Sequence, residues 1–197
     1  MGGCFYHSQG ETMKLNLGCG MNKMSGHINV DKFPQCQPDV VMDMEVTPWT
    51  FKDNEVDGIV LNHVLEHIGK DVDVFFGVMK EMYRVCKNGA IIEINVPHPR
   101  HDNFINDPTH VRIITPDLMT LFSKKKCQMW KETNSSNSPL ALYLDVDFEM
   151  VSANIIIEER YMAKLQSGAM TQDAYSEIYK TCNNVASEFR IKLQVVK

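Results

Sequence analysis

The chain has 197 residues, 44% of them hydrophobic and 23% charged, which is enough to bury the core of one globular domain. Its formal net charge of -5 disfavours a surface built to bind a nucleic-acid backbone, because such surfaces depend on Lys and Arg. No apolar run reaches the ~18 residues of a membrane span, and the N-terminus lacks the layout of a signal peptide. We therefore expect neither a nucleic-acid nor a membrane partner.

The six cysteines are scattered along the chain and include no C-x-x-C pair. A chain of this length does not need disulfide bonds for stability, so the cysteines predict reduced thiols and a cytoplasmic location. Residues 1–12 are polar and are expected to form a loose extension, and residues 13–197 are expected to form one domain. Nothing in the sequence indicates an oligomeric state.

Short runs rich in β-branched residues recur in the first half of the chain and predict strands. They lie at 14–17, 27–31, 39–44, 56–62 and 90–96. Between the last two runs, apolar residues at steps of three or four predict a helix, with Asp71 as its N-cap and Gly89 just past its end. Strands that alternate with helical segments predict an α/β fold with a mainly parallel sheet and helices on both faces.

The second half begins with residues 97–115, which have no clear periodicity, and loops of this length in compact domains are often functional. Thr115 and Pro116 predict the start of a helix whose C-terminal end would carry the basic run 124–126. The remaining segments are a polar break at 131–139, an alternating run at 144–157, a helical segment at 158–183 interrupted near Ser167 and Gly168, and a final antiparallel strand at 188–196.

The turn after the first strand carries Gly18 and Gly20 in the G-x-G spacing of a dinucleotide-binding loop. The third glycine position holds Lys23, and Asp31 follows Gly18 by 13 residues instead of ~20. The ten residues 18–27 must make the whole crossover, which leaves almost no room for a helix that binds a pyrophosphate. The loop is therefore predicted to hold a ligand without a diphosphate, whose ribose hydroxyls Asp31 can accept.

Four motifs in this order resemble the class I S-adenosylmethionine-dependent methyltransferases, and among them the small type 11 group. The motifs are LNLGCG at 15–20, Asp31 at the end of the second strand, Asp43-Met44 after the third, and Asn62-His63-Val64-Leu65-Glu66-His67 after the fourth. The resemblance spans about residues 14–97 and implies a single-domain, Rossmann-like methyltransferase fold.

The resemblance also implies which residues contact S-adenosylmethionine. Gly18 and Gly20 would face its methionine part, Asp31 its ribose, and Asp43 and Met44 its adenine. Asn62 and His63 would lie near the reactive sulfonium. The full set expected to contact the cofactor is Leu17, Gly18, Cys19, Gly20, Asp31, Lys32, Asp43, Met44, Asn62 and His63.

The reaction implied is in-line methyl transfer to a small molecule or a protein side chain. The Asn/Asp-Pro-Pro-aromatic signature of amino-directed nucleic-acid methyltransferases would follow the fourth strand, where this chain has Asn62-His63-Val64-Leu65. In loop 97–115, His98 and His110 are the candidate general bases. Arg100 and Arg112 are an alternative, as residues that would hold an acceptor carboxylate or phosphate.

Two other functions stay open on the sequence. The first is a metal-dependent enzyme that uses the residues His98, His101, Asp102, Asp107 and His110 of the same loop, although their spacing matches no metal signature and no metal ligand is predicted. The second is a protein that binds the cofactor without turnover, because no residue on the acceptor side is diagnostic. A nicotinamide-dependent oxidoreductase is disfavoured by the short spacing from Gly18 to Asp31.

Overall fold

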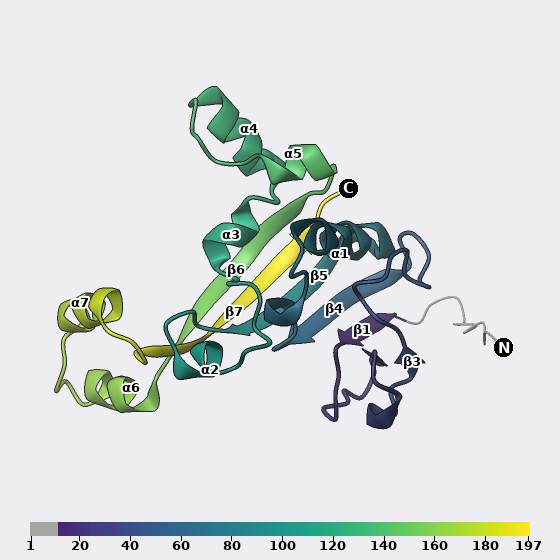
Figure 1. Ribbon diagram of the computed structural model, residues 1–197. Coiled ribbons are helices and arrows are strands. Elements are labelled where there is room, and N and C mark those ends of the chain that lie inside the picture. Colours follow the sequence, from purple (N-terminus) through teal and green to yellow (C-terminus); the bar gives the residue numbers. More distant parts are fainter. Residues whose placement is uncertain (1–11) are drawn as a thin grey trace.

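The computed structural model describes residues 12–197, so the predicted extension 1–12 lies outside the described residues except for residue 12. Seven strands form one sheet in the order β3-β2-β1-β4-β5-β7-β6 (Figure 1). The strands are β1 (Lys14–Leu17), β2 (Ile28–Asp31), β3 (Val40–Val41), β4 (Val56–Asn62), β5 (Cys86–Pro97), β6 (Phe148–Ile157) and β7 (Ala186–Val195). β7 is antiparallel to both of its neighbours, and all other pairs are parallel. The predicted α/β fold with a C-terminal antiparallel strand is confirmed.

The helices lie mostly in the second half of the chain. They are α1 (Val72–Val85), α2 (Asp102–Ile105), α3 (Pro116–Thr120), α4 (Lys124–Glu132), α5 (Leu140–Leu144), α6 (Glu159–Gln166) and α7 (Gln172–Thr181), with 3-10 turns at Pro34–Cys36 and Leu65–His67. Figure 1 shows α4 and α5 beyond one end of β6 and β7, and α6 and α7 beyond the other end. None of the helices within residues 12–197 combines the length and the hydrophobicity that a membrane span requires.

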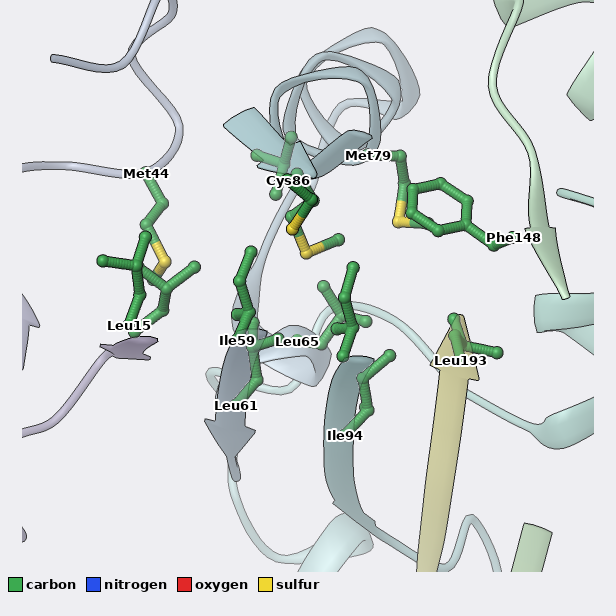
Figure 2. Packing of buried hydrophobic residues seen from close by; sticks show 14 of the residues in the cluster. Leu15, Met44, Ile59, Leu61, Leu65, Met79, Cys86, Ile94, Phe148 and Leu193 are labelled. Atoms are coloured by element: carbon green, nitrogen blue, oxygen red, sulfur yellow. The ribbon is translucent and has the colours of Figure 1, made fainter. Parts of the chain in front are cut away.

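α1 begins at its predicted cap and covers one face of the sheet. It ends at Val85, however, and Gly89, which was predicted just past the helix, lies within β5. The Asp71 side chain caps it by accepting a hydrogen bond from the backbone N–H of Asp73 at 2.8 Å. Its apolar stripe, which includes Met79, is buried against side chains from the central strands. Figure 2 shows Ile59, Ile94 and Leu193 pointing from β4, β5 and β7 toward the layer in which Met79 lies. Burial of each such side chain stabilises the fold by about 1.5–3 kcal/mol.

The other face of the sheet is only partly covered. Among the described residues, the connections from β1 to β2 and from β2 to β3 contain no α-helix, because each has too few residues to form a crossover helix. Alternate residues of the central strands are half-buried or exposed on this face, and Lys192 pairs there with Glu93 at 2.9 Å. A shallow hollow of about 440 Å³ includes Val60 and Ile91. Helices were predicted on both faces of the sheet, but they cover the two faces to unequal extents.

The helix predicted after Thr115 is two helices, and the basic run lies at the start of the second. Thr115 caps α3, and Ser123 caps α4 by accepting from the backbone N–H of Lys126 at 3.1 Å. The positive end of the α4 dipole would repel lysines, but two carboxylates from the segment before β6 compensate. Asp147 accepts from the Lys124 backbone N–H at 2.9 Å, and Asp145 pairs with the Lys124 ammonium at 2.6 Å.

Several strand and helix limits differ from the predicted ranges. The run at 39–44 is a strand only at Val40–Val41, and the alternating run at 144–157 is a strand only from Phe148. The predicted interruption near Gly168 is confirmed, since this glycine has a φ of +74° between α6 and α7. The five cysteines among residues 12–197 are free thiols.

Candidate cofactor site

A cavity of about 410 Å³ lies beyond the carboxyl ends of β1, β2 and β4, within the size range of small-molecule sites. Its lining consists of Gly18, Asp31, Lys32, Phe33, Met42, Asp43, Met44, His63, Val64, His67, Ile68 and Thr109. It thus includes Gly18, Asp31, Lys32, Asp43, Met44 and His63 of the residues expected to contact the cofactor. Open α/β sheets bind ligands at this edge because the loops that follow parallel strands converge there.

Asp31 is held in place by the two turns that flank it. One carboxylate oxygen accepts the backbone N–H of Gly20 at 2.8 Å, and the other accepts that of Phe33 at 2.9 Å. The residue is buried at the end of β2. Each oxygen keeps a further lone pair, so the carboxylate can also accept hydrogen bonds from a ligand. Gly20 does not line the cavity and contributes through this contact with Asp31.

Gly18 lies in the turn after β1 and directly against Val64, which follows β4. Its φ is +66°, and an added Cβ would come within 2.6 Å of Cγ2 of Val64. Only glycine fits this backbone conformation and this close approach without strain. The G-x-G pattern detected this position correctly, but the structure shows that Val64 is the neighbour that requires it.

Leu17 and Cys19 lie on either side of Gly18 but do not line the cavity. Both are buried in the core, and the Cys19 backbone N–H donates to the Val30 carbonyl at 3.0 Å. Burial, with a smaller contribution from Asp31, raises the pKa of the Cys19 thiol. A thiol of this kind is not a nucleophile.

The segment after β3 supplies the apolar part of the wall. Met44 is buried, and its carbonyl accepts the Trp49 indole N–H at 2.9 Å, which ties this turn to the core. Asp43 forms a tight turn by accepting the Glu45 backbone N–H at 3.0 Å. Phe33 and Met42 complete this side of the cavity, and the sequence analysis missed both because no motif contains them.

His63 lies between two carboxylates at the edge of the cavity. Its Nε2 is 3.0 Å from Glu188 of β7, and its Nδ1 is 3.5 Å from the buried carboxylate of Glu66. These carboxylates, Glu66 first, raise the pKa of His63, although partial burial acts in the opposite direction. The residue has a φ of +52°, a strained conformation of the kind that collects at functional sites. Asn62 does not line the cavity; it is exposed and pairs with the amide of Asn95.

His98, one of the two predicted bases, is not at the cavity. It is 4% exposed; its Nε2 is 3.0 Å from the Tyr179 hydroxyl, and its Nδ1 accepts the Arg100 backbone N–H at 3.2 Å. The ring lies against Phe189. Burial, helped by the charges of Arg100 and His101, lowers the pKa of His98 to about 4. The geometry is that of a neutral histidine that joins α7 to the end of β5.

We expect the stability of the protein to fall between pH 6.5 and pH 4 because of His98. In this window the unfolded chain binds a proton at His98 that the folded protein excludes, so the free energy of unfolding decreases as the pH falls, by about 2–3 kcal/mol in total. Urea denaturation at pH 7 and pH 4.5 measures the decrease, and His98→Gln should show a smaller one. An equal decrease in both proteins would show that other groups cause it. The raised pKa of His63 acts in the opposite direction and is common to both proteins.

The remaining residues of loop 97–115 point in different directions. His101 pairs with Glu158 at 3.1 Å, and His110 bonds the Phe104 carbonyl through Nδ1 at 2.9 Å. Arg100 and Arg112, the alternative acceptor clamps, donate to backbone carbonyls and so anchor the loop. The structure therefore does not assemble the five-residue metal set considered in this loop.

Thr109 is the residue of this loop that reaches the cavity lining. Just after it, the backbone N–H groups of Val111 and Arg112 both donate to the Glu66 carbonyl, at 2.9 and 3.1 Å. The loop is thus fastened to the 3-10 turn that follows β4. Loop 97–115 thus contributes to the cavity lining through Thr109.

Comparison with known proteins agrees with this geometry. A family model described as a methyltransferase domain, of the type 11 group, matches residues 20–94. Comparison with curated protein sequences finds no match. A SAM-dependent methyltransferase from Archaeoglobus fulgidus is similar in structure, with 20% identity, a TM-score of 0.59, and coverage of 94% of this chain and 87% of that one.

Two further solved structures share the fold over nearly the whole chain. A SAM-dependent methyltransferase from Methanosarcina mazei has 15% identity and a TM-score of 0.52, and the match covers 96% of this chain and 94% of that one. The cyclase SpnF has 15% identity and a TM-score of 0.53, with 95% and 76% covered. Structural likeness at these identities establishes the fold, and the family model identifies the type of domain.

The fold is that of S-adenosylmethionine-dependent methyltransferases, and residues 20–94 match the model of a methyltransferase domain. This match covers 75 of the 197 residues and supports an S-adenosylmethionine-dependent methyltransferase of the type 11 group.

Proposed function

We propose that this enzyme transfers the methyl group to a small molecule or a protein side chain, and that the cavity at the ends of β1, β2 and β4 holds the cofactor. The observation that carries the proposal is the convergence of Asp31, Asp43, Met44 and His63 on one cavity of suitable size. These residues come from three separate turns, each fixed by its own hydrogen bonds or by the core.

The side chains present fit the chemistry of S-adenosylmethionine. Asp31 would accept the ribose hydroxyls with the lone pairs that its two backbone donors leave free. Asp43 would accept the adenine amino group, and Met44 and Phe33 would pack against the ring. The bound cofactor supplies an electrophilic methyl group, and the contribution of the protein is to align this group with the acceptor and to exclude water.

The acceptor is proposed to approach beside His63, His67 and Thr109, the polar residues on the side of the cavity away from β2 and β3. Both nitrogens of His63 face carboxylates, which favour the protonated, positively charged ring. His63 is therefore a poor candidate for the base that would remove a proton from the acceptor. His98 and His110 do not line the cavity, which does not favour either of them as the base. The acidic net charge continues to favour an acceptor other than a nucleic acid.

We expect Asp31→Asn to weaken S-adenosylmethionine binding by about 1.5–3 kcal/mol, the range for losing hydrogen bonds to a charged group. Titration calorimetry with the cofactor measures this change. Asp39→Asn is a matched control, because Asp39 also accepts two N–H groups, the backbone and side-chain N–H of Asn29 in β2, but lies outside the cavity. The control should lose some thermal stability and keep its cofactor affinity.

If both variants bind the cofactor as tightly as the parent protein, the ribose site is elsewhere and the assignment of the cavity is wrong. A screen of small-molecule and peptide acceptors by mass spectrometry tests the second half of the proposal. Tight cofactor binding with no transfer to either acceptor class would favour a protein that binds the cofactor without turnover.

A further inference from the structure

The carboxylate of Glu66 is buried next to the cofactor cavity without a hydrogen-bond donor. Glu66 is 0% exposed, and within residues 12–197 neither of its carboxylate oxygens has a hydrogen-bond partner. The charged or chargeable side chains within 4.0 Å among these residues are His63 at 3.5 Å and His110 at 4.0 Å. A buried carboxylate normally has direct donors or a cation to balance its lost hydration. His63 at 3.5 Å makes no hydrogen bond with Glu66, so both carboxylate oxygens are free to bind a further positive partner.

Two histidines complete a cluster around this carboxylate. Ligand atoms of Glu66, His67 and His110 all lie within 4.8 Å of one another. The rings of the two histidines are arranged edge to face, with their centroids 4.5 Å apart. Two ligands of one zinc ion are roughly 3.4 Å apart, given bond lengths near 2.1 Å and tetrahedral angles. Small side-chain rotations would therefore bring the three ligand atoms to a common ion.

The hydrogen bonds around the cluster place both imidazole protons on Nδ1. Nδ1 of His110 is 2.9 Å from the Phe104 carbonyl, which can only accept. Nδ1 of His67 is 2.9 Å from the Thr109 hydroxyl, which already donates its own proton to Asp107 at 2.6 Å. Each neutral ring thus keeps a free lone pair on Nε2, the arrangement that second-shell partners impose on metal-binding histidines.

We propose that Glu66, His67 and His110 bind a divalent transition-metal ion such as Zn²⁺ at the edge of the cofactor cavity. Two imidazoles and one carboxylate form a ligand set that suits Zn²⁺ or Fe²⁺ and leaves coordination positions open. The second oxygen of Asp107, 3.8 Å from Nε2 of His110, is a candidate for a further ligand. This set differs from the one considered on the sequence, where no metal ligand was predicted and neither Glu66 nor His67 was among the candidates.

The ion would join two parts of the chain that border the cofactor. Glu66 and His67 belong to the 3-10 turn after β4, and His110 belongs to loop 97–115. His67 and Thr109 also line the cavity. Binding of the ion would therefore hold the loop against the cavity edge and should raise the thermal stability of the folded protein.

Binding of Zn²⁺ and Co²⁺ to protein treated with a chelator tests this proposal without an activity assay. Calorimetry with ZnCl₂ should show one site per chain, and CoCl₂ should give the visible absorption of a bound ion. His67→Ala, His110→Ala and Glu66→Gln should each weaken Zn²⁺ binding at least tenfold. His27→Ala, which removes a histidine from the turn before β2, should bind as the parent does.

The Glu66→Gln variant adds a stability test. It removes the buried charge, so without metal its melting temperature should equal or exceed that of the parent, while added Zn²⁺ should stabilise only the parent. His67 is partly exposed, and its variant keeps the experiment decisive if a buried substitution disturbs folding. The proposal is overturned if the parent shows no saturable binding, or if the parent and the His67→Ala variant bind Zn²⁺ equally.

Discussion

A chain that ends at residue 184 is expected not to fold cooperatively, because β7 is the strand that joins β5 to β6. It pairs with β5 from Ile91–Gln194 to Pro97–Glu188, and with β6 along the opposite edge. Without β7, the edge strand β6 has no neighbouring strand to pair with. The end of β5 would also lose the contact in which the His98 backbone N–H donates to the Ser187 carbonyl at 2.9 Å.

The energy involved is comparable with the whole stability of a domain. Phe189, Ile191, Leu193 and Val195 are all buried on the α1 side of the sheet. At about 1.5–3 kcal/mol for each side chain, their burial contributes roughly 6–12 kcal/mol, against a net stability of about 5–15 kcal/mol for most domains. The truncated protein should therefore be insoluble, or compact without a cooperative thermal transition.

Substitutions on the exposed face of β7 provide the control for this truncation. Arg190→Ser and Lys192→Ser remove exposed ion pairs to Glu188 and Glu93, which are worth about 0–1 kcal/mol each. The doubly substituted full-length chain should still melt cooperatively. A truncated chain that is soluble and melts in one sharp transition would show that β7 is not required for the fold.

Gly18→Ala is expected to destabilise the protein by about 2–5 kcal/mol. A left-handed backbone conformation costs a residue with a side chain about 1–2 kcal/mol, and forcing a methyl group into a packed site adds about 1–3 kcal/mol. Both costs apply here, because the φ of Gly18 is +66° and the added Cβ would lie 2.6 Å from Val64. Since both residues line the cavity, cofactor affinity should also fall. Thermal or urea denaturation measures the stability.

Gly20→Ala separates the two costs. Gly20 also has a positive φ, +49°, but an added Cβ there meets no described atom within 4 Å. Its substitution should therefore cost only the conformational part, about 1–2 kcal/mol. Adding Val64→Ala to Gly18→Ala should recover part of the stability by removing the steric conflict. Equal losses for the two glycine variants would mean that contact with Val64 is unimportant.

Local sequence pattern was sufficient for much of the fold. The apolar stripe of α1, the caps Asp71 and Thr115, and the alternation in β7 all produced the predicted elements, because these signals depend on neighbours within one or two turns. The exception was the helix after Thr115. The second of its two helices is contacted at Lys124 by Asp145 and Asp147, which lie more than twenty residues later in the chain.

The cofactor cavity was predictable in outline for a related reason. Gly18 and Asp43 follow strands and Asp31 is the last residue of β2, and parallel strands bring their carboxyl ends to one edge. The residues that the motifs missed, such as Phe33 and Thr109, reach the cavity only through the paths of their loops. Those paths depend on contacts with distant segments, which a single sequence does not reveal.

The sequence by itself determined the α/β class, the strands and the loop that faces a ligand without a diphosphate, because periodicity, caps and glycine spacing are local properties. Only the tertiary structure decided the roles of the histidines. His98 and His110 belong to the same loop, yet one is buried beneath Tyr179 and the other lies beside Glu66. Whether a histidine packs in the core, pairs with a carboxylate or faces a ligand depends on which distant residues surround it, and folding alone brings those residues together.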